Sequence, residues 1–446
     1  MTYDLIIIGA GAAGLFAAAN VPVGMKTLVL EKTEKPGQKL LLTGSGQCNL
    51  TNDEPIKLFT RRYGANGKRI RPVLYRFSNM ALMEFFVHNA VELTVREDGK
   101  VFPKSMKSAD VLRLLLDLCK ARNVEFRCAA EVTDIAALDE SGVFGAFAED
   151  GHEACEASAK SAGNACGFSV RTAETQFLAK CILVATGGVS YPQTGSDGTF
   201  FSCLERLGLT LVPRRPALTS IVVSYYPYSE LSGLSFTRSR VEISRGESGF
   251  SAKLDDGLLL THKGFSGPAV LNISRYVMPG DIMTVNYLQG ETGADLYAAL
   301  MTAAAGDARQ IDTLLSAVTA LPRSFTQCVC RRVNIEPGEK ASRLSGKEMD
   351  KLAKAITADS FEVTGTGGFS TAMTTAGGVS LDEVNLRTME STRYPGLYFS
   401  GEVLDIDGDT GGYNLQFAFS SAISSIQAIE EILAVPLCPV SPALRE

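Results

Sequence analysis

The chain has 446 residues, of which 45% are apolar and 21% charged, and its formal net charge is −6. This composition excludes a disordered or fibrous protein, because it supplies enough apolar surface for packed cores, and the length predicts two or three domains. The acidic balance argues against general binding to nucleic acids or anionic membranes, which needs an excess of basic charge. We therefore expect neither as a partner.

The first predicted elements form a strand, a turn and a helix. Leu5–Ile8 is typical of a buried parallel strand, Gly9–Gly14 is a G-x-G-x-x-G turn, and the alanine-rich Leu15–Val21 predicts a helix. The three glycines allow a tight turn, close approach to a pyrophosphate, and close packing of helix on strand. A second strand, Thr27–Leu30, ends at Glu31, which can accept a hydrogen bond from a ribose hydroxyl and would repel a 2′-phosphate. FAD or NAD is favoured over NADP, and the alternative is an ordinary glycine-rich turn.

A basic stretch follows. Between Lys57 and Arg76 there is no acidic residue, and the basic residues are Lys57, Arg61, Arg62, Lys68, Arg69, Arg71 and Arg76. Such a run is most often a solvated surface. Two alternatives are a transient site for nicotinamide phosphates and a contact with RNA.

Two strands further along the chain end in similar turns. Cys181–Val184 runs into the small-residue turn Ala185–Gly188, and Gly396–Phe399 runs towards Gly401 and Glu402. After Asp405–Asn414 a helix is predicted from about Leu415 to Leu433, and its N-terminus would suit an anionic or carbonyl group. Segments from both ends of the chain around one dinucleotide favour FAD. The acids at 405, 407 and 409 resemble a calcium loop, but the last EF-hand ligand is absent.

The cysteines and histidines predict no metal site. Ten scattered cysteines and the lack of a signal peptide favour reduced thiols in a cytoplasmic protein. Only His88, His152 and His262 are present, and Cys328 and Cys330 form no zinc-type spacing. The apolar run Leu5–Ala19 is broken by glycines, so no membrane span is expected.

Several motifs together resemble a known family, the HI0933-like or YhiN-like FAD-dependent (NAD(P)/FAD) oxidoreductases, which include aminoacetone oxidases and BaiN-type flavoproteins. The segments that carry this resemblance run in family order and are Gly37–Asn52, Gly99–Pro103, Ala185–Pro192, Thr261–Pro268, Gly377–Val379 and Gly401–Gln416. One departure is Gln47, because the family usually has arginine there. A second is Asp150–Gly167, which has the composition of an inserted surface loop.

The resemblance implies an α/β fold with a Rossmann-like FAD-binding domain of the two-dinucleotide-binding-domain flavoprotein type. We expect this domain at residues 1–190 and 366–446, interrupted at 191–365 by a β-barrel-like part followed by a helical part. The sequence independently favours such an insert, because strand-like runs precede helical ones there; these runs are Ser220–Ser224, Val241–Ser244, Gly257–Thr261, Ala308–Leu321 and Lys347–Thr357.

The predicted FAD contacts combine the glycine-rich turns with polar positions that the resemblance assigns. They are Gly9, Gly11, Ala13, Gly14, Glu31, Lys32, Lys39, Thr43, Gly44, Gly46, Cys48, Asn49, Val132, Ala185, Thr186, Gly187, Gly401, Glu402, Asp405, Gly411, Gly412, Tyr413 and Asn414. Cys48 is a candidate redox partner of the flavin, although a packed thiol is favoured. Val132 is either an adenine contact through its backbone or a plain strand residue.

The expected activity is hydride transfer between flavin N5 and a small organic substrate, with NAD(P)H as a transient reductant. One alternative is an oxygen-using amine oxidase like aminoacetone oxidase. Another, of a different class, is a non-catalytic FAD-containing or RNA-associated protein. His262 and Tyr191 are candidate proton donors, and a structural role is the alternative for each. The sequence does not specify the oligomeric state.

Overall fold

The computed structural model describes residues 2–139, 142–144, 167–246 and 249–434. The chain forms two compact units, Met1–Arg215 with Thr374–Glu446, and Pro216–Met373. These boundaries differ from the expected 190/191 and 365/366, because α7 (Phe201–Arg206) buries Phe201 and Leu204 in the core of the first unit. The predicted insertion Asp150–Gly167 lies, apart from Gly167, outside the described residues.

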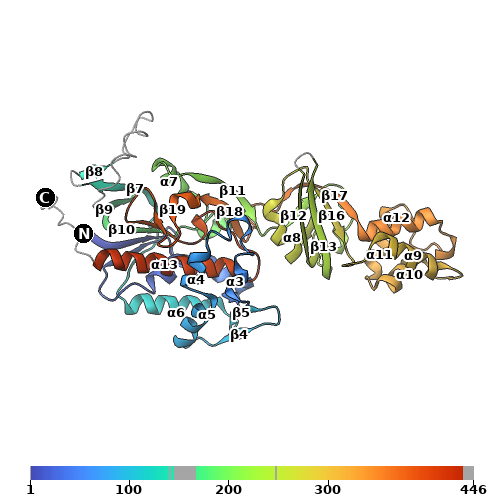
Figure 1. Ribbon diagram of the computed structural model, residues 1–446, viewed down its shortest axis with the longest axis horizontal. Coiled ribbons are helices and arrows are strands. Elements are labelled where there is room, and N and C mark those ends of the chain that lie inside the picture. The colour runs from blue at the N-terminus through green and yellow to red at the C-terminus, as the bar shows by residue number, and fades with distance from the viewer. Residues whose placement is uncertain (1, 140–141, 145–166, 247–248, 435–446) are drawn as a thin grey trace. The chain divides into compact units, whose positions relative to one another are not determined.

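The first unit is built on a sheet whose centre is parallel (Figure 1). Its parallel strands pair in the order β21, β10, β1, β2, β6, so that the last strand of the chain lies beside strands from the N-terminal part. Their bounds are β1 (Thr2–Ile8), β2 (Thr27–Leu30), β6 (Glu125–Arg127), β10 (Gln176–Val184) and β21 (Leu397–Phe399). The predicted strand Thr27–Leu30 agrees with β2.

The sides of this sheet are extended by short antiparallel strands and covered by helices. Beyond β21 the order continues with β20 (Glu390–Ser391) and β19 (Val384–Asn385). A branch of antiparallel strands pairs with the first residues of β10 and consists of β9 (Gly167–Thr172), β7 (Val132–Asp139) and β8 (Gly142–Phe144). The remaining elements of this unit are α1 (Ala12–Ala18), α2 (Gln38–Leu42), η1 (Thr43–Gly46), β3 (Thr51–Asn52), α3 (Ile56–Phe59), η2 (Gly64–Asn66), α4 (Arg71–Arg76), α5 (Asn79–His88), β4 (Leu93–Val95), β5 (Lys100–Pro103), α6 (Ser108–Ala121), η5 (Pro192–Thr194), β11 (Leu211–Ala217), β18 (Thr374–Val379), η9 (Leu381–Glu383), η10 (Gly401–Val403) and α13 (Tyr413–Ala434).

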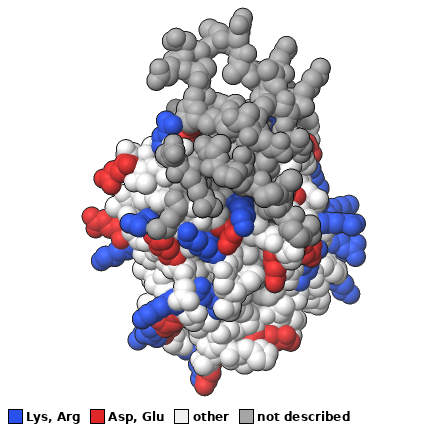
Figure 2. Space-filling model, turned by 90° about the vertical axis from the view of Figure 1, so that its left-hand side faces the viewer, with Lys and Arg blue, Asp and Glu red and all other residues white. Residues whose placement is uncertain are grey.

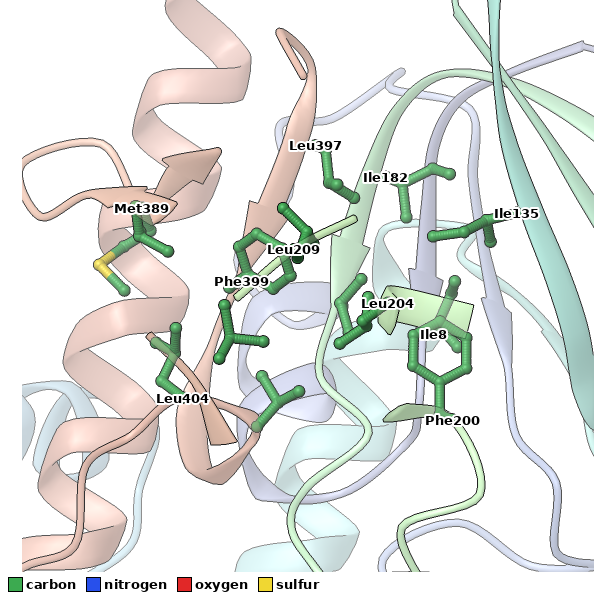
Figure 3. Packing of buried hydrophobic residues seen from close by; sticks show 14 of the residues in the cluster. Ile8, Ile135, Ile182, Phe200, Leu204, Leu209, Met389, Leu397, Phe399 and Leu404 are labelled. Carbon is green, nitrogen blue, oxygen red and sulfur yellow. The ribbon is translucent and has the colours of Figure 1, made fainter. Parts of the chain in front are cut away.

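Alternate residues of β1 enter different cores, because successive side chains of a strand point to opposite faces. Leu5 and Ile7 pack in a cluster with residues of α1, α6 and α13. Ile8 packs on the other face with Ile182, Phe200 and Leu204, as Figure 3 shows. The sheet is therefore buried on both sides, as the unbroken apolar run of β1 predicts.

The second unit has its own core. Six strands form a closed barrel in the order β12, β15, β14, β13, β16, β17, and one apolar cluster joins the barrel to the helices that follow. The elements are β12 (Ile221–Val223), η6 (Ser229–Leu231), β13 (Ser235–Arg245), β14 (Phe250–Leu260), β15 (Gly264–Ser266), α8 (Pro268–Ile273), η7 (Ser274–Tyr276), β16 (Ile282–Asn286), α9 (Gly293–Ala304), α10 (Ile311–Thr319), α11 (Arg323–Arg332), η8 (Ala341–Arg343), α12 (Gly346–Thr357) and β17 (Asp359–Thr366).

The surface is mixed in charge where Figure 2 shows it, with acidic and basic side chains interspersed. This agrees with the near balance of 43 basic and 49 acidic residues. In the described part of the chain, no helix is both long enough and apolar enough to cross a membrane.

A buried carboxylate joins the barrel to the helices of the second unit. Asp359, at the start of β17, accepts hydrogen bonds from the hydroxyls of Tyr228 (2.7 Å) and Tyr287 (3.0 Å) and pairs with Arg332 at 2.7 Å. Its side chain is 1% exposed. Removing one partner of such a group leaves the others buried and unpaired, which is costly.

We predict that Asp359→Ala lowers the free energy of unfolding of this unit by about 3 kcal/mol. The matched control is Asp350→Ala, which breaks an ion pair with Lys354 of the same 2.7 Å length on the exposed face of α12. The Asp350→Ala variant should lose less than about 0.5 kcal/mol of unfolding free energy. Urea denaturation followed by circular dichroism measures both, and equal costs would refute the structural role of Asp359.

Candidate functional site

The carboxyl ends of the parallel strands meet at one edge of the sheet. Ile8 is in register with Leu30 and with Val184, and Val184 is in register with Phe399. The residues that follow these strands, Gly9, Glu31, Ala185 and Ser400, therefore lie side by side. This is the edge at which open α/β sheets bind ligands.

Three backbone segments approach closely at the Gly9–Gly14 turn. Gly9 has φ +98°, and a Cβ there would lie 2.6 Å from the carbonyl oxygen of Ala185 and 3.0 Å from the Cα of Thr186. A Cβ on Gly14 would lie 1.9 Å from the Gly9 carbonyl oxygen. These two positions require glycine for packing alone.

Gly11 is different, because a Cβ there would have no atom of this chain within 4 Å. It stands at the N-terminus of α1, which no side chain caps. Nearby, Ala13 is buried beside Gly401, whose added Cβ would lie 3.0 Å from that of Ala13. The open space over Gly11 is where backbone N–H groups can meet a pyrophosphate.

Glu31 is held in place by the neighbouring backbone. One carboxylate oxygen accepts a hydrogen bond from the Ala10 N–H at 2.7 Å, and the other accepts from the N–H and hydroxyl of Thr33, each at 2.8 Å. Its side chain is nearly buried. A carboxylate fixed at the end of β2 suits a ribose hydroxyl.

Lys32 belongs to a cluster beside Glu31. Its ammonium group lies 2.6 Å from Asp197 and 3.2 Å from Glu131, and it donates to the hydroxyl of Thr199 at 3.1 Å. Partial burial lowers the pKa of Lys32, but the two carboxylates outweigh it and raise the pKa above its ordinary value. Lys32 is thus already paired within the protein.

The Ala185–Gly188 turn faces polar groups. Gly187 has φ +76°, and a Cβ there would lie 3.0 Å from the hydroxyl oxygen of Ser196. That oxygen is buried and has no hydrogen-bond partner among the described residues. An orphaned buried hydroxyl beside a glycine turn is the feature expected where a polar ligand completes the site.

Lys39 and Glu402 form a partly buried ion pair at the same turn. The Lys39 ammonium lies 2.7 Å from one carboxylate oxygen, and the other accepts from the Ser190 hydroxyl at 2.8 Å and the Thr375 N–H at 2.9 Å. A Cβ on Gly188 would lie 2.8 Å from the same carboxylate. Lys39 and Glu402 were predicted from the sequence. Ser190 lies within the Ala185–Pro192 motif but was not singled out as a contact, and Thr375 was missed because no motif includes it.

The segment after Lys39 turns sharply. Gly44 and Gly46 have φ +57° and +85°, and the Thr43 hydroxyl donates to the Leu40 carbonyl at 2.6 Å. With its amide turned to suit its neighbours, Asn49 donates to the Thr51 carbonyl and accepts from the Gly412 N–H, both at 3.0 Å. Asn49 thus joins this segment to the loop at Asp405–Asn414, which we call the C-terminal loop.

Cys48 is completely buried, with φ +62°. Burial raises the pKa of its thiol to about 12, so that the thiolate is absent at neutral pH. The packed thiol is thereby favoured over the redox partner.

The side chain of Gln47 is contacted by the guanidinium of Arg96. The Arg96 side chain donates to the Gln47 side-chain oxygen at 2.7 Å and lies over the Phe102 ring at 4.1 Å from its centre. The position at which the family has an arginine therefore still has a guanidinium beside it. Sequence reasoning missed Arg96 because the two residues lie 49 positions apart.

The C-terminal loop is held mainly by its own bonds. Asn414 forms two hydrogen bonds with the backbone of Gly408, and Asp405 accepts from the Gly377 N–H at 3.1 Å. The Tyr413 hydroxyl donates to Glu54 at 2.9 Å, and burial and this bond raise the pKa of Tyr413. Gly411 and Gly412 have φ +124° and +95°. The side chains of Asn414 and Tyr413 therefore stabilise the loop, and their polar groups already have hydrogen-bond partners within the protein.

The remaining predicted residues are spread over both units. Val132 begins β7, directly after Glu131 and close in sequence to Ala130, whose N–H donates to the Glu31 carbonyl. Tyr191 has φ +54° just after the Ala185–Gly188 turn. His262 is exposed in the bend between β14 and β15 of the second unit. Its role as a proton donor stays a prediction.

A parallel sheet with a glycine-rich turn, a fixed acid after β2 and open space over Gly11 defines a dinucleotide-binding protein of the Rossmann type. The two chain ends meeting at one edge, with the Ser196 hydroxyl left for a ligand, fit FAD. A family profile, the HI0933-like protein Rossmann domain, matches residues 3–428. The chain belongs to this HI0933-like family and is an FAD-dependent oxidoreductase.

Curated relatives span nearly the same length. The ribosomal RNA dihydrouridine synthases of Escherichia coli and Haemophilus influenzae are 31% and 29% identical, covering 95% of this chain and 97% and 98% of theirs. The 3-dehydro-bile acid delta(4,6)-reductase of Clostridium scindens is 29% identical over 95% of this chain and 98% of its own.

We predict that Gly11→Ala leaves the fold intact but raises the dissociation constant for FAD by at least about tenfold, because the methyl group enters the space left for the pyrophosphate. The matched control is Gly365→Ala in the second unit, which also meets no atom within 4 Å. Fluorescence titration of the apoprotein with FAD measures both. Unchanged affinity in Gly11→Ala would remove this turn from the cofactor site.

A second prediction concerns the buried thiol. In the native protein at pH 8, iodoacetamide should label Cys128 and Cys328, which are partly exposed, well before Cys48. Mass spectrometry of peptides over time measures the order, with urea-unfolded protein as the control in which all three react alike. Early labelling of Cys48 would restore it as a redox candidate.

Proposed function

We propose that the protein is an FAD-dependent reductase that saturates a carbon–carbon double bond conjugated to a carbonyl group, with uridine in RNA as its substrate and NAD(P)H as its reductant. The observation that carries this proposal is the 31% identity, over 95% of the chain, to a ribosomal RNA dihydrouridine synthase. The coverage includes both units, so the whole architecture is shared.

The names of the relatives point to one reaction chemistry. Dihydrouridine arises when a hydride and a proton add across the C5–C6 double bond of uracil, which is conjugated to the C4 carbonyl. A 3-dehydro-bile acid with a delta(4) double bond is likewise an enone. FAD supplies the hydride when bound, and NAD(P)H provides the two electrons and leaves as NAD(P)+.

The residues of this chain would hold the cofactor and exclude water from it. Gly11 and the α1 N-terminus would take the pyrophosphate, and Glu31 the ribose. The Lys39–Glu402 pair, fixed by Ser190 and Thr375, keeps opposite charges in place at the Gly188 turn. Such preorganised charge needs no rearrangement when charge develops nearby.

Uridine in RNA is preferred over a bile acid for two reasons. Two of these three relatives are dihydrouridine synthases, and the basic stretch at Lys57–Arg76 suits a polyanion rather than a sterol. This proposal departs from the expectation of no nucleic-acid partner. A net charge of −6 concerns the whole surface, whereas binding of RNA depends on the local one.

The test is anaerobic reduction followed by addition of acceptors. NADPH or NADH should bleach the visible absorbance of the bound flavin, and uridine-containing RNA should restore it, with a mass gain of two hydrogens on a uridine. Wild-type apoprotein from which the FAD has been removed is the control for non-enzymatic reduction.

Other outcomes separate the alternatives. If a 3-oxo-Δ4 steroid restores the flavin absorbance and RNA does not, the substrate is a steroid and not RNA, and the proposed class of reaction stands. Fast reoxidation by air after bleaching by an amine, and no bleaching by nicotinamide, would indicate the amine oxidase instead.

A further inference from the structure

We propose that the face formed by α3, η2 and α4 docks the phosphates of RNA beside the cofactor site. This inference rests on the proposed function and adds the surface that would hold the substrate. We call it the basic surface, and it is defined by the side chains of Lys57, Arg61, Lys68, Arg71, Tyr75 and Arg76.

The charges of this surface are available to a ligand. All six side chains are exposed, and within the described residues no ion pair engages Lys57, Arg61, Lys68 or Arg71. The other two basic residues of the stretch differ, since Arg62 pairs with Glu54 and Arg69 with Asp382. Of these four, Arg61 lies near enough to Glu54 to help lower the pKa of that carboxylate, which its main partner Arg62 also lowers. Four exposed cations that form no ion pairs on so short a stretch favour a polyanion.

An aromatic side chain lies among these charges. Tyr75 is 44% exposed, and the Arg71 guanidinium lies 4.9 Å from the centre of its ring. Met80, at the start of the adjacent α5, is 55% exposed. Exposed aromatic groups among cations are typical of sites for single-stranded nucleic acid, because bases stack on the rings. A free inorganic anion would not need them.

The inner side of the same stretch is bonded to the loop that borders the predicted cofactor site. The Tyr63 hydroxyl donates to the Tyr413 carbonyl at 2.8 Å, and the Asn66 amide donates to the Asp405 carbonyl at 2.9 Å. The Arg62 carbonyl accepts from the Asp409 N–H at 2.8 Å. These bonds, spread along the loop, fix the basic surface to it.

Because the basic surface is fixed to this loop, it would also fix where bound RNA lies relative to the cofactor site. Buried Phe59, Tyr63 and Ile70 anchor the stretch in the first unit. RNA phosphates bound on its outer side would therefore stand at a constant distance from the Asp405–Asn414 loop, and an unpaired base could reach past that loop. The basic surface would determine binding of RNA and leave the reactivity of the flavin unchanged.

The test compares two fourfold charge reversals that change the net charge equally. The first is Lys57→Glu, Arg61→Glu, Lys68→Glu and Arg71→Glu in the FAD-loaded full chain. The matched control is Lys107→Glu, Lys120→Glu, Lys347→Glu and Lys351→Glu, at exposed positions on other elements. A milder version of the first variant uses glutamine at the same four positions, in case the reversal impairs folding.

The probe is a uridine-containing single-stranded RNA of about twenty nucleotides, measured by fluorescence anisotropy at several salt concentrations. We expect the first variant to bind at least about tenfold more weakly, and the slope of log affinity against log salt to fall by about 0.7 for each phosphate that the variant no longer neutralises. The control variant should bind like the wild type. Both should be bleached by NADPH at the wild-type rate.

Each other result overturns the inference in a recognisable way. If the wild type binds and reduces the RNA but the first variant binds it equally well, the basic surface is refuted and the proposed function stands. If the wild type binds no RNA at low salt, RNA is not the ligand of this surface. Binding of anionic lipid vesicles, abolished in the first variant, would then assign the surface to a membrane. Slower bleaching by NADPH in the first variant alone, with FAD binding unchanged, would overturn the inference and assign the surface to the phosphates of the nicotinamide cofactor.

Discussion

A Cβ on Gly9 would lie 2.6 Å from the carbonyl of Ala185, and one on Gly14 would lie 1.9 Å from the carbonyl of Gly9. The end of β1, the start of α1 and the end of β10 are thus as close as backbone can be. This crowding leaves Gly11 as the one of the three glycines that faces open space, and it is there that we predict the pyrophosphate to bind. Next to this turn, the Glu31 carboxylate accepts from the Ala10 N–H, and the Ser196 hydroxyl lies beside Gly187.

The second unit interrupts the first without disturbing this close approach. The chain leaves through β11 and returns through β18, and these two strands pair in a small sheet, so that the ends of the insert lie together. Insertions with adjacent ends are tolerated because they stretch nothing in the host domain. The insert has its own core and its own buried charge at Asp359.

Charge acts at two scales in this protein. The net charge of −6 describes a mixed surface, as Figure 2 shows for one face. The stretch between Lys57 and Arg76 differs because only two of its seven basic residues pair with carboxylates in the described part of the chain. Lys39 and Lys32 are paired with carboxylates at the candidate cofactor site. The cations of the basic surface that form no such pairs are the ones that we propose bind RNA.

What the sequence specified about this region is local. The strand Thr27–Leu30, the tight turn at Gly9 and the close packing at Gly14 follow from apolar runs and turn chemistry within a short N-terminal segment, and the contact of Gly11 with a pyrophosphate stays a prediction. Tertiary structure decided what depends on residues far apart in the chain. Only the tertiary structure shows that Ser190 and Thr375 donate hydrogen bonds to Glu402 and that Arg96 donates one to Gln47. It also shows that the basic stretch is hydrogen-bonded to the C-terminal loop. The first segment of the first unit also ends at Arg215 and not at the predicted 190, because the burial of Phe201 and Leu204 depends on a sheet assembled from both ends of the chain.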